Sequence, residues 1–325
     1  MADTHGWLSR GTGYWSPRSY FWSGNDEVVY LRAESSAYKR VVRKRLSPPG
    51  VADIDTALRL PVSCVDLQLS PDGRALSWIE SRTATTYGSK VAYLDGSMSR
   101  EVPTLGEHIW GSDNSTLIQF RYKGGEGPAR IGLCSFDIRS GLTKTVWADL
   151  KKAPSFVSKY AQALGAVPGQ LLHSYPDGRV LTGTRMWRRL GAPRADPLSF
   201  CYYDSRDPAA PIAQWEVPVP GGDSGLTFVS PDGQRLLWIE SDRSVFSQDV
   251  IIHKILPVFK IRSRGIMRLL VSDLRGGGMH VIATHDFGEA APSSPPIVPG
   301  DFAWTPDNRR VSFTYNNALY TLKAD

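Results

Sequence analysis

Short apolar segments separated by turns rich in Gly, Pro and Asp recur along the whole chain. Residues 76–79 and 236–239 are the clearest examples, with the sequences Leu-Ser-Trp-Ile and Leu-Leu-Trp-Ile. These segments lack the strict alternation of a strand that has one solvent-facing side. A strand that is apolar on both faces belongs in a sheet that is covered on both sides. The pattern therefore predicts an all-β chain whose sheets pack against one another.

The turns form an internal repeat. Residues 70–81 and 230–241 are identical at nine of twelve positions, and both begin with Ser-Pro-Asp-Gly. Looser copies of the same turn begin at residues 23, 111, 175 and 305. Six copies divide the chain into units of about 54 residues, a length typical of propeller blades.

The turn chemistry predicts β-hairpins. Pro71 presets φ at the first central position, Asp72 tolerates the second, and Gly73 supplies the positive φ that follows. We expect a three-residue hairpin loop here. Each unit then continues with a further strand, turn and strand, as in residues 266–283. The sequence predicts one domain over residues 1–325, a six-bladed β-propeller of four-stranded antiparallel blades.

The Ser-Pro-Asp-Gly-(Arg/Gln) turn, followed by an apolar strand with Trp, resembles the PD-type repeats of TolB-like six-bladed β-propellers. The resemblance extends over the whole chain through its six turns, of which three copies are sharp. It implies the propeller fold and a role as a protein-binding scaffold, which most members of that family have. Many members are periplasmic and carry a signal peptide. The start of this chain has no basic and then apolar signal pattern, so we expect a cytoplasmic location or the cytoplasmic face of a membrane.

The last unit is one strand short. It offers a strand before Thr305 and strands at 310–315 and 318–323, after which the chain ends. We expect residues 5–12, approximately, to form the outer strand of this blade and so to close the ring. Closure would remove exposed sheet edges.

Four long segments interrupt the regular pattern. Segments 185–197 and 242–265 fall between the second and third strands of a unit, and segments 148–170 and 284–300 connect consecutive units. Such connections share one face of a propeller, and long loops in compact domains usually carry function. Within them, the sequence predicts a short helix over 154–164 and an extended Pro-rich connector over 288–300.

The chain has a net charge of +6 and an isoelectric point near 9.2, and basic residues outnumber acidic ones in the long segments expected on this face. The candidate partner-binding residues are Lys151, Lys152, Arg185, Arg188, Arg189, Arg194, Lys254, Ile255, Leu256, Phe259, Lys260, Arg262 and Arg264. They predict docking to an acidic partner, with simple solvation of the surface as the alternative. The apolar residues of segment 242–265 leave three contacts open: the segment's own blade, another protein, or an anionic lipid surface.

Catalytic motifs are missing from the sequence. Residues 222–225 (Gly-Asp-Ser-Gly) resemble a protease nucleophile turn, but no matching His or Asp motif accompanies them. The six histidines do not have metal-ligand spacing, and no phosphate-binding Gly-rich loop precedes a helix. We therefore expect no cofactor and no metal, and nucleic acid is not an expected partner. Cys64, Cys134 and Cys201 each lie in an apolar run, which indicates buried reduced thiols.

Taken together, these patterns predict a non-catalytic scaffold or interaction subunit. It would dock through its basic, loop-rich face onto other protein subunits, an acidic or membrane-associated assembly. The alternative is a metal- or sugar-dependent enzyme, hydrolase- or lactonase-like, with its site in the central channel. Candidate channel residues for that alternative are Glu107, His108 and Asp301.

Overall fold

A computed structural model describes most of the chain. The described residues are 20–48, 50–81, 87–103, 108–123, 130–149, 170–183, 198–207, 211–218, 226–241, 264–289, 299–316 and 318–325. They consist of strands and the turns that join them. Within this part of the chain, no helix has the length and apolar character needed to span a membrane.

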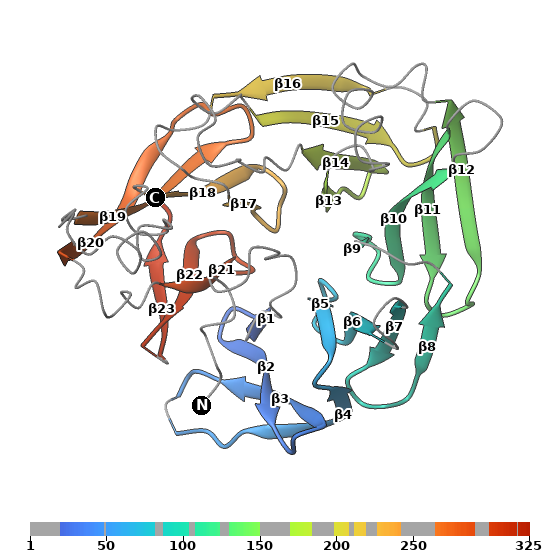
Figure 1. The fold of residues 1–325 in the computed structure, drawn as a ribbon, viewed down its shortest axis with the longest axis horizontal. Helices are drawn as coiled ribbons and strands as arrows, with labels where there is room; N and C mark the ends of the chain where they lie inside the picture. Colours follow the sequence, from blue (N-terminus) through green and yellow to red (C-terminus); the bar gives the residue numbers. More distant parts are fainter. Residues whose placement is uncertain are drawn as a thin grey trace, which may run out of the picture. The chain divides into compact units, whose positions relative to one another are not determined.

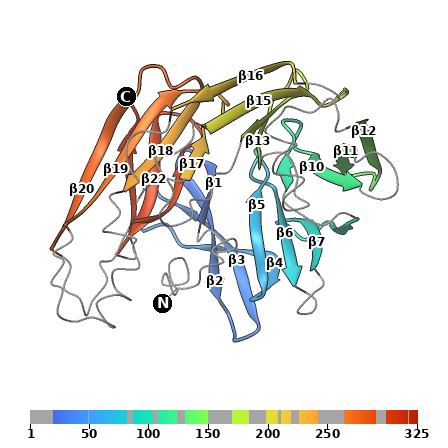
Figure 2. The ribbon, with the colours of Figure 1, turned by 45° about the horizontal axis from the view of Figure 1, so that its top comes forward.

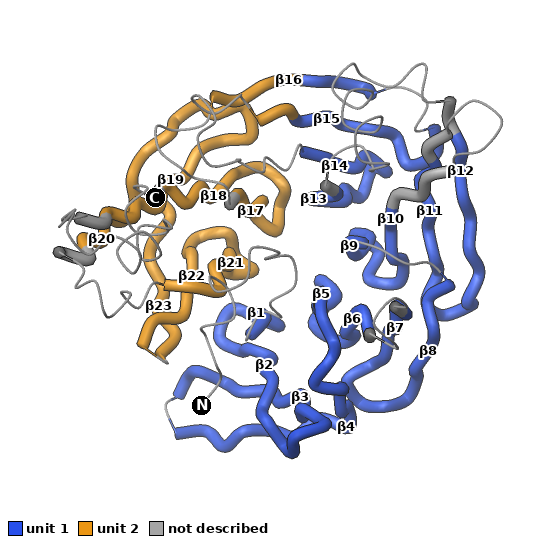
Figure 3. Tube along the Cα trace, in the orientation of Figure 1, with its two compact units in different colours: residues 1–184, 200–214 blue, residues 185–199, 215–325 orange. Residues whose placement is uncertain are grey.

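The chain divides into two compact units (Figure 3). Unit 1 comprises residues 1–184 and 200–214, and unit 2 comprises residues 185–199 and 215–325. The boundary runs within the fourth sheet, whose last two strands have residues in both units.

Unit 1 contains three complete four-stranded sheets (Figure 1). The first has β1 (Tyr20–Gly24), β2 (Glu27–Ala33), β3 (Tyr38–Arg45) and β4 (Ile54–Pro61). The second has β5 (Cys64–Leu69), β6 (Ala75–Ser81), β7 (Tyr87–Tyr93) and β8 (Ser99–Val102). The third has β9 (His108–Trp110), β10 (Thr116–Lys123), β11 (Arg130–Asp137) and β12 (Thr143–Asp149).

The remaining sheets follow the same order. The fourth has β13 (Gln170–Ser174), β14 (Arg179–Gly183), β15 (Leu198–Asp204) and β16 (Ala213–Val217). In unit 2, the fifth has β17 (Leu226–Val229), β18 (Arg235–Ser241), β19 (Arg264–Asp273) and β20 (His280–Glu289). The sixth has β21 (Gly300–Trp304), β22 (Arg310–Tyr315) and β23 (Ala318–Lys323).

Every sheet is a meander in which consecutive strands pair, as the hydrophobic pattern predicts. The fold class is therefore the expected one: an all-β chain built from the six antiparallel blades of a β-propeller. The sixth blade has three strands among the described residues. Residues 5–12, which we expect to supply its fourth strand, lie outside that part of the chain, as does the helix expected over 154–164.

The repeated turn has a specific hydrogen-bonding pattern. Ser70 Oγ donates to Asp72 Oδ1 at 2.6 Å and accepts from the main-chain nitrogens of Arg74 and Ala75 at 3.2 and 2.9 Å. Ser70 N closes the loop by donating to Ala75 O at 2.8 Å. The loop thus holds four residues, from Pro71 to Arg74, and not the expected three. The Ser70 hydroxyl oxygen accepts hydrogen bonds from the amide of Arg74, at the end of the loop, and from that of Ala75, just beyond it. Residues 230–235 form the same pattern.

A left-handed residue follows the Asp-containing turn in five of the six blades. It is Gly73, Asn114, Gly178, Gly233 or Asn308, with φ between 59° and 90°. The turn of the first blade differs, because Gly24 pairs with Glu27 and only two residues connect the strands. That tighter turn explains why its sequence is the least similar to the repeat.

The second strand of the repeat is buried on both faces, as its sequence predicts. Ala75, Leu76 and Ser77 are fully buried in β6, and Leu236 and Leu237 are fully buried in β18. Burial of a Leu-sized side chain contributes about 1.5–3 kcal/mol. The repeated strand is therefore a main source of stability in each unit.

One expected connection is partly a strand. The sequence predicts a connection between blades over segment 284–300, but β20 continues to Glu289, because it pairs with β19 up to Arg264 opposite Glu289. The β19–β20 hairpin, ten residues on each side, is longer than its neighbours β17 and β18 (Figure 2). The insertion after β18 therefore joins a long hairpin.

Tryptophans connect consecutive blades within each unit. In unit 1, Trp110 Nε1 donates to Gln68 O of the preceding blade at 3.1 Å. In unit 2, Trp304 Nε1 donates to Phe228 O at 3.0 Å. Gln68 and Phe228 both stand two residues before the repeated Ser, so the two bonds are equivalent. The repeat thus explains part of the high Trp content.

Candidate interaction surface

Most of the predicted partner-binding residues lie outside the described part of the chain. These are Lys151, Lys152, Arg185, Arg188, Arg189, Arg194, Lys254, Ile255, Leu256, Phe259, Lys260 and Arg262. Arg264 is the exception, and its main chain begins β19 opposite Glu289. The interpretation of these residues as a docking face stays a prediction.

Two of the three candidate channel residues are among the described residues, and each contacts a side chain of another strand. His108 begins β9, is buried, and its Nε2 lies 2.7 Å from Ser77 Oγ of the preceding blade. Asp301 lies in β21 at φ 54° and accepts a hydrogen bond from Thr314 Oγ1 at 3.1 Å. Glu107 lies outside the described residues.

The three cysteines are free and buried, as their apolar surroundings predict. Burial raises the pKa of Cys64 to about 11 and that of Cys201 to about 12. In the described ranges, no group of three or more His, Cys, Asp or Glu side chains is arranged to hold a metal ion.

Three arginines lie in one row across the first blade. Arg32 of β2 is the direct partner of Arg40 of β3, and Arg40 is the direct partner of Arg59 of β4. Directly opposed residues point to the same face of a sheet, and strands are about 4.8 Å apart. Like charges in this arrangement repel, so the row needs an energetic compensation.

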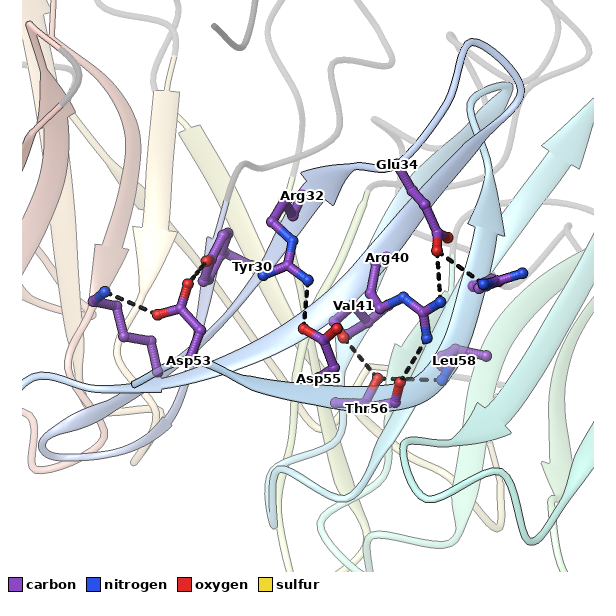
Figure 4. A network of polar contacts seen from close by, with 11 residues as sticks. Tyr30, Arg32, Glu34, Arg40, Val41, Asp53, Asp55, Thr56 and Leu58 are labelled. Carbon is purple, nitrogen blue, oxygen red and sulfur yellow. Dashed lines mark hydrogen bonds and ion pairs between the residues drawn. The ribbon is translucent and has the colours of Figure 1, made fainter. Parts of the chain in front are cut away.

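Two carboxylates provide that compensation (Figure 4). Arg32 Nη2 donates to Asp55 Oδ1 at 2.5 Å. Arg40 Nη2 and Arg59 Nη2 both donate to Glu34 Oε1, at 2.6 and 2.8 Å. The hydrogen bond from Arg40 is the main cause that lowers the pKa of Glu34. Three guanidinium groups thus share two carboxylates, and one positive charge is left over.

A second polar group anchors the segment that precedes β4. Tyr30 donates its hydroxyl hydrogen to Asp53 Oδ2, and Lys44 Nζ donates to Asp53 Oδ1 at 2.9 Å (Figure 4). The hydrogen bond from Tyr30 is the largest cause that lowers the pKa of Asp53, and the bond from Lys44 is the next. Burial, together with the contact with Asp53, raises the pKa of Tyr30 to about 12. This group is balanced in charge, which distinguishes it from the arginine row.

Exposed apolar groups lie beside the arginine row. Tyr38 and Val62 are 50% and 41% exposed. Tyr38 pairs with Pro61, and Val62 N donates to Ala37 O at 2.9 Å, which places the β2–β3 turn and the residues after β4 at one end of the sheet. We name the surface formed by Arg32, Glu34, Tyr38, Arg40, Asp55, Arg59 and Val62 the blade-1 surface.

The sequence analysis did not single out this surface. The signal was β3, with the sequence Tyr-Lys-Arg-Val-Val-Arg-Lys-Arg and no acidic residue. Whether this basic strand forms a charged surface depends on which residues of β2 and β4 lie opposite it. The register between β3 and β4 includes a bulge between Arg40 and Val42.

No protein-family model matches the chain, and no curated protein matches it. Among solved structures, it is similar to a putative TolB from Agrobacterium tumefaciens, with 13% identity, a TM-score of 0.48, and coverage of 94% of this chain and 89% of that one. It is also similar to the β-propeller domain of the Trilobed protease from Pyrococcus furiosus, with 13% identity, a TM-score of 0.44, and coverage of 95% of this chain and 82% of that one. A third similar structure is an oligogalacturonate lyase in complex with manganese, with 12% identity, a TM-score of 0.49, and coverage of 94% of this chain and 89% of that one. The assignment of the fold rests on the sheets described above and not on these likenesses.

Proposed function

We propose that this propeller is a non-catalytic scaffold or interaction subunit. It docks through the basic loops of segments 148–170, 185–197 and 242–265 onto other protein subunits. The partner is an acidic assembly associated with the cytoplasmic side of a membrane. The protein itself contributes binding and no reaction.

The observation that carries this proposal is the surplus of arginine on the blade-1 surface. This surface lies at the end of the first sheet where the second strand turns into the third and the fourth leads to the next blade. In the fourth sheet, which has the same antiparallel meander, the connection between β14 (ending at Gly183) and β15 (beginning at Leu198) joins the corresponding strand ends. We therefore expect the basic loops at the same end of the repeating unit as the blade-1 surface.

The test is quantitative co-purification with tagged protein from the native source. Replacing Arg185, Arg188, Arg189 and Arg194 with Gln should remove stoichiometric partners that the wild-type protein retains. A matched control removes four positive charges from exposed turn residues at the other end of the blades, with Arg74→Gln, Arg139→Gln, Arg275→Gln and Arg309→Gln, and should retain those partners. Equal recovery with wild-type protein and the loop variant would refute docking through this loop.

The same preparation separates the scaffold from the enzyme alternative. Elemental analysis of the purified protein should show no stoichiometric metal. A tightly bound metal that is lost on substitution of Asp301 would instead support a channel enzyme.

A further inference from the structure

We propose that the blade-1 surface binds an acidic segment of a protein partner, whose carboxylates replace Glu34 between Arg40 and Arg59. This inference rests on the proposed scaffold function and specifies the partner's chemistry at one site. The blade-1 surface is formed by other residues than the three loop segments through which the proposed function has the propeller dock.

The first argument is the unused binding capacity of the arginines. A guanidinium has five N–H donors in a planar arrangement that suits carboxylates. Arg59 is 58% exposed, and among the described residues it contacts Glu34 through one nitrogen. Both Arg40 and Arg59 use the same Glu34 oxygen, so a bidentate partner carboxylate would make hydrogen bonds that Glu34 does not make.

The second argument is the position of Glu34. It stands in the β2–β3 turn, directly after the last residue of β2, and its carboxylate is partly exposed. A turn residue is easier to displace than one inside a strand. Asp55, in contrast, lies within β4, so the Arg32 pair belongs to the sheet itself. Glu34 is therefore the group that a partner would replace.

The third argument is charge. The surplus positive charge of the row remains when Glu34 occupies the site, and it rises by one when Glu34 leaves. An incoming acidic segment restores the balance, and its carboxylates could contact neighbouring arginines, which come from adjacent strands about 4.8 Å apart. Tyr38 and Val62 offer apolar contacts beside them.

The probe is a fluorescein-labelled peptide of eight glutamates, with binding to the full chain measured by fluorescence anisotropy at low salt. The double variant Arg40→Gln/Arg59→Gln should weaken binding about tenfold, or about 1.4 kcal/mol, because two exposed ion pairs with the peptide are lost. The control Arg139→Gln/Lys144→Gln removes the same charge from the third blade and should leave the affinity within about twofold. Glu34→Gln should tighten binding, because it removes the resident competitor.

Equal weakening by the two double variants would overturn the proposal, because binding would then follow net charge and not the arginine row. So would unchanged affinity of Glu34→Gln. Phosphatidylglycerol vesicles provide the second arm: loss of vesicle binding in the Arg40/Arg59 variant with peptide binding intact would assign the surface to lipid instead. Melting curves of all variants exclude misfolding as a cause. If the loop variant still loses its native partners while the peptide result is negative, the scaffold function stands and this inference falls.

Discussion

Trp238 donates its indole hydrogen to Ser272 Oγ at 2.8 Å, and the equivalent Trp78 lacks this bond because Ala92 occupies the position of Ser272. The Trp78 nitrogen is buried and has no hydrogen-bond partner in the part of the chain that the structure describes. The two repeat segments are nearly identical in sequence, yet only the second has a hydrogen bond for its Trp nitrogen. The residue that makes the difference, Ala92 or Ser272, lies outside the segments, on the third strand of each blade.

Replacing Ala92 with Ser should stabilise the protein. The new hydroxyl would satisfy the Trp78 nitrogen, for a gain of about 1 kcal/mol in the free energy of unfolding, or about 2 °C in Tm. The converse change, Ser272→Ala, should cost about 1–3 kcal/mol because it leaves the Trp238 nitrogen unsatisfied. Thermal unfolding checks both. A lower Tm for Ala92→Ser would show that the buried site has no room for the oxygen.

Substitutions at two glycines of one turn can distinguish backbone strain from side-chain packing. Gly276 and Gly278 have φ of 81° and 61°, so alanine at either costs about 1–2 kcal/mol in the left-handed region. A Cβ at Gly276 would lie 2.6 Å from Val217 Cγ1, whereas one at Gly278 meets nothing within 4 Å. Gly276→Ala should therefore destabilise by about 1–3 kcal/mol more than Gly278→Ala in urea unfolding. Equal losses would mean that the contact with β16 adds nothing.

Acid should destabilise the protein partly through its turn aspartates. A main-chain hydrogen bond from Ser140 is the largest cause that lowers the pKa of Asp137. A lowered pKa in the folded state gives stability that is present above the unfolded value of about 3.9 and is lost as the pH falls through the folded value. Asp137→Asn should therefore reduce the loss of stability between about pH 5 and pH 3, measured by urea unfolding.

Salt provides the control for this prediction. The hydrogen bond from the Arg206 side chain is the largest cause that lowers the pKa of Asp204 to about 2. Because that pair is exposed and charged on both sides, high salt should weaken the contribution of Asp204 and largely spare that of Asp137. An identical salt response of Asp137→Asn and Asp204→Asn would contradict the assignment.

The three thiols should be protected in the native protein. Burial and the raised pKa values of Cys64 and Cys201 keep the reactive thiolate scarce near neutral pH. A thiol reagent such as Ellman's should label almost none of them natively and all three in urea. Fast stoichiometric labelling without denaturant would show that a cysteine becomes exposed.

Removal of the N-terminus tests the predicted closing strand. Deletion of residues 1–12 should lower Tm markedly, because β23 would lose the strand expected to pair with it. Deletion of residues 1–4 alone should leave Tm unchanged, which makes it the matched control. An unchanged melting curve for the longer deletion would sink the prediction.

The repeating blades could be predicted from sequence because their determinants are local. Ser70, Asp72 and Gly73 form their turn from adjacent residues, and the same order of residue types forms it again at Ser230. The arginine row could not be predicted in this way. Its members come from three strands, and the pairing of Arg40 with Arg59 is set across the eight residues between β3 and β4 and the bulge beyond Arg40.

The end of β20 shows a second limit of sequence. Residues 284–289 (Thr-His-Asp-Phe-Gly-Glu) are mostly polar, contain Gly and lack the apolar pattern of a strand. They are a strand because β19 offers them hydrogen-bond partners. Likewise, the burial of His108 against Ser77 depends on a neighbouring blade, which no spacing within the third blade reveals.

The contacts that join neighbouring blades gather near the short turns. Arg43 Nη2 donates to Gly73 O at 2.7 Å, and Trp215 Nε1 donates to Leu274 O at 2.6 Å. These acceptors lie in or beside the turns from first to second and from third to fourth strand. These two contacts do not involve the connections from second to third strand or those between consecutive blades, which lie at the opposite end of the strands. Insertions there can lengthen, change charge or be exchanged between related proteins at little cost to folding, so one end of this repeat can preserve the architecture while the other diversifies.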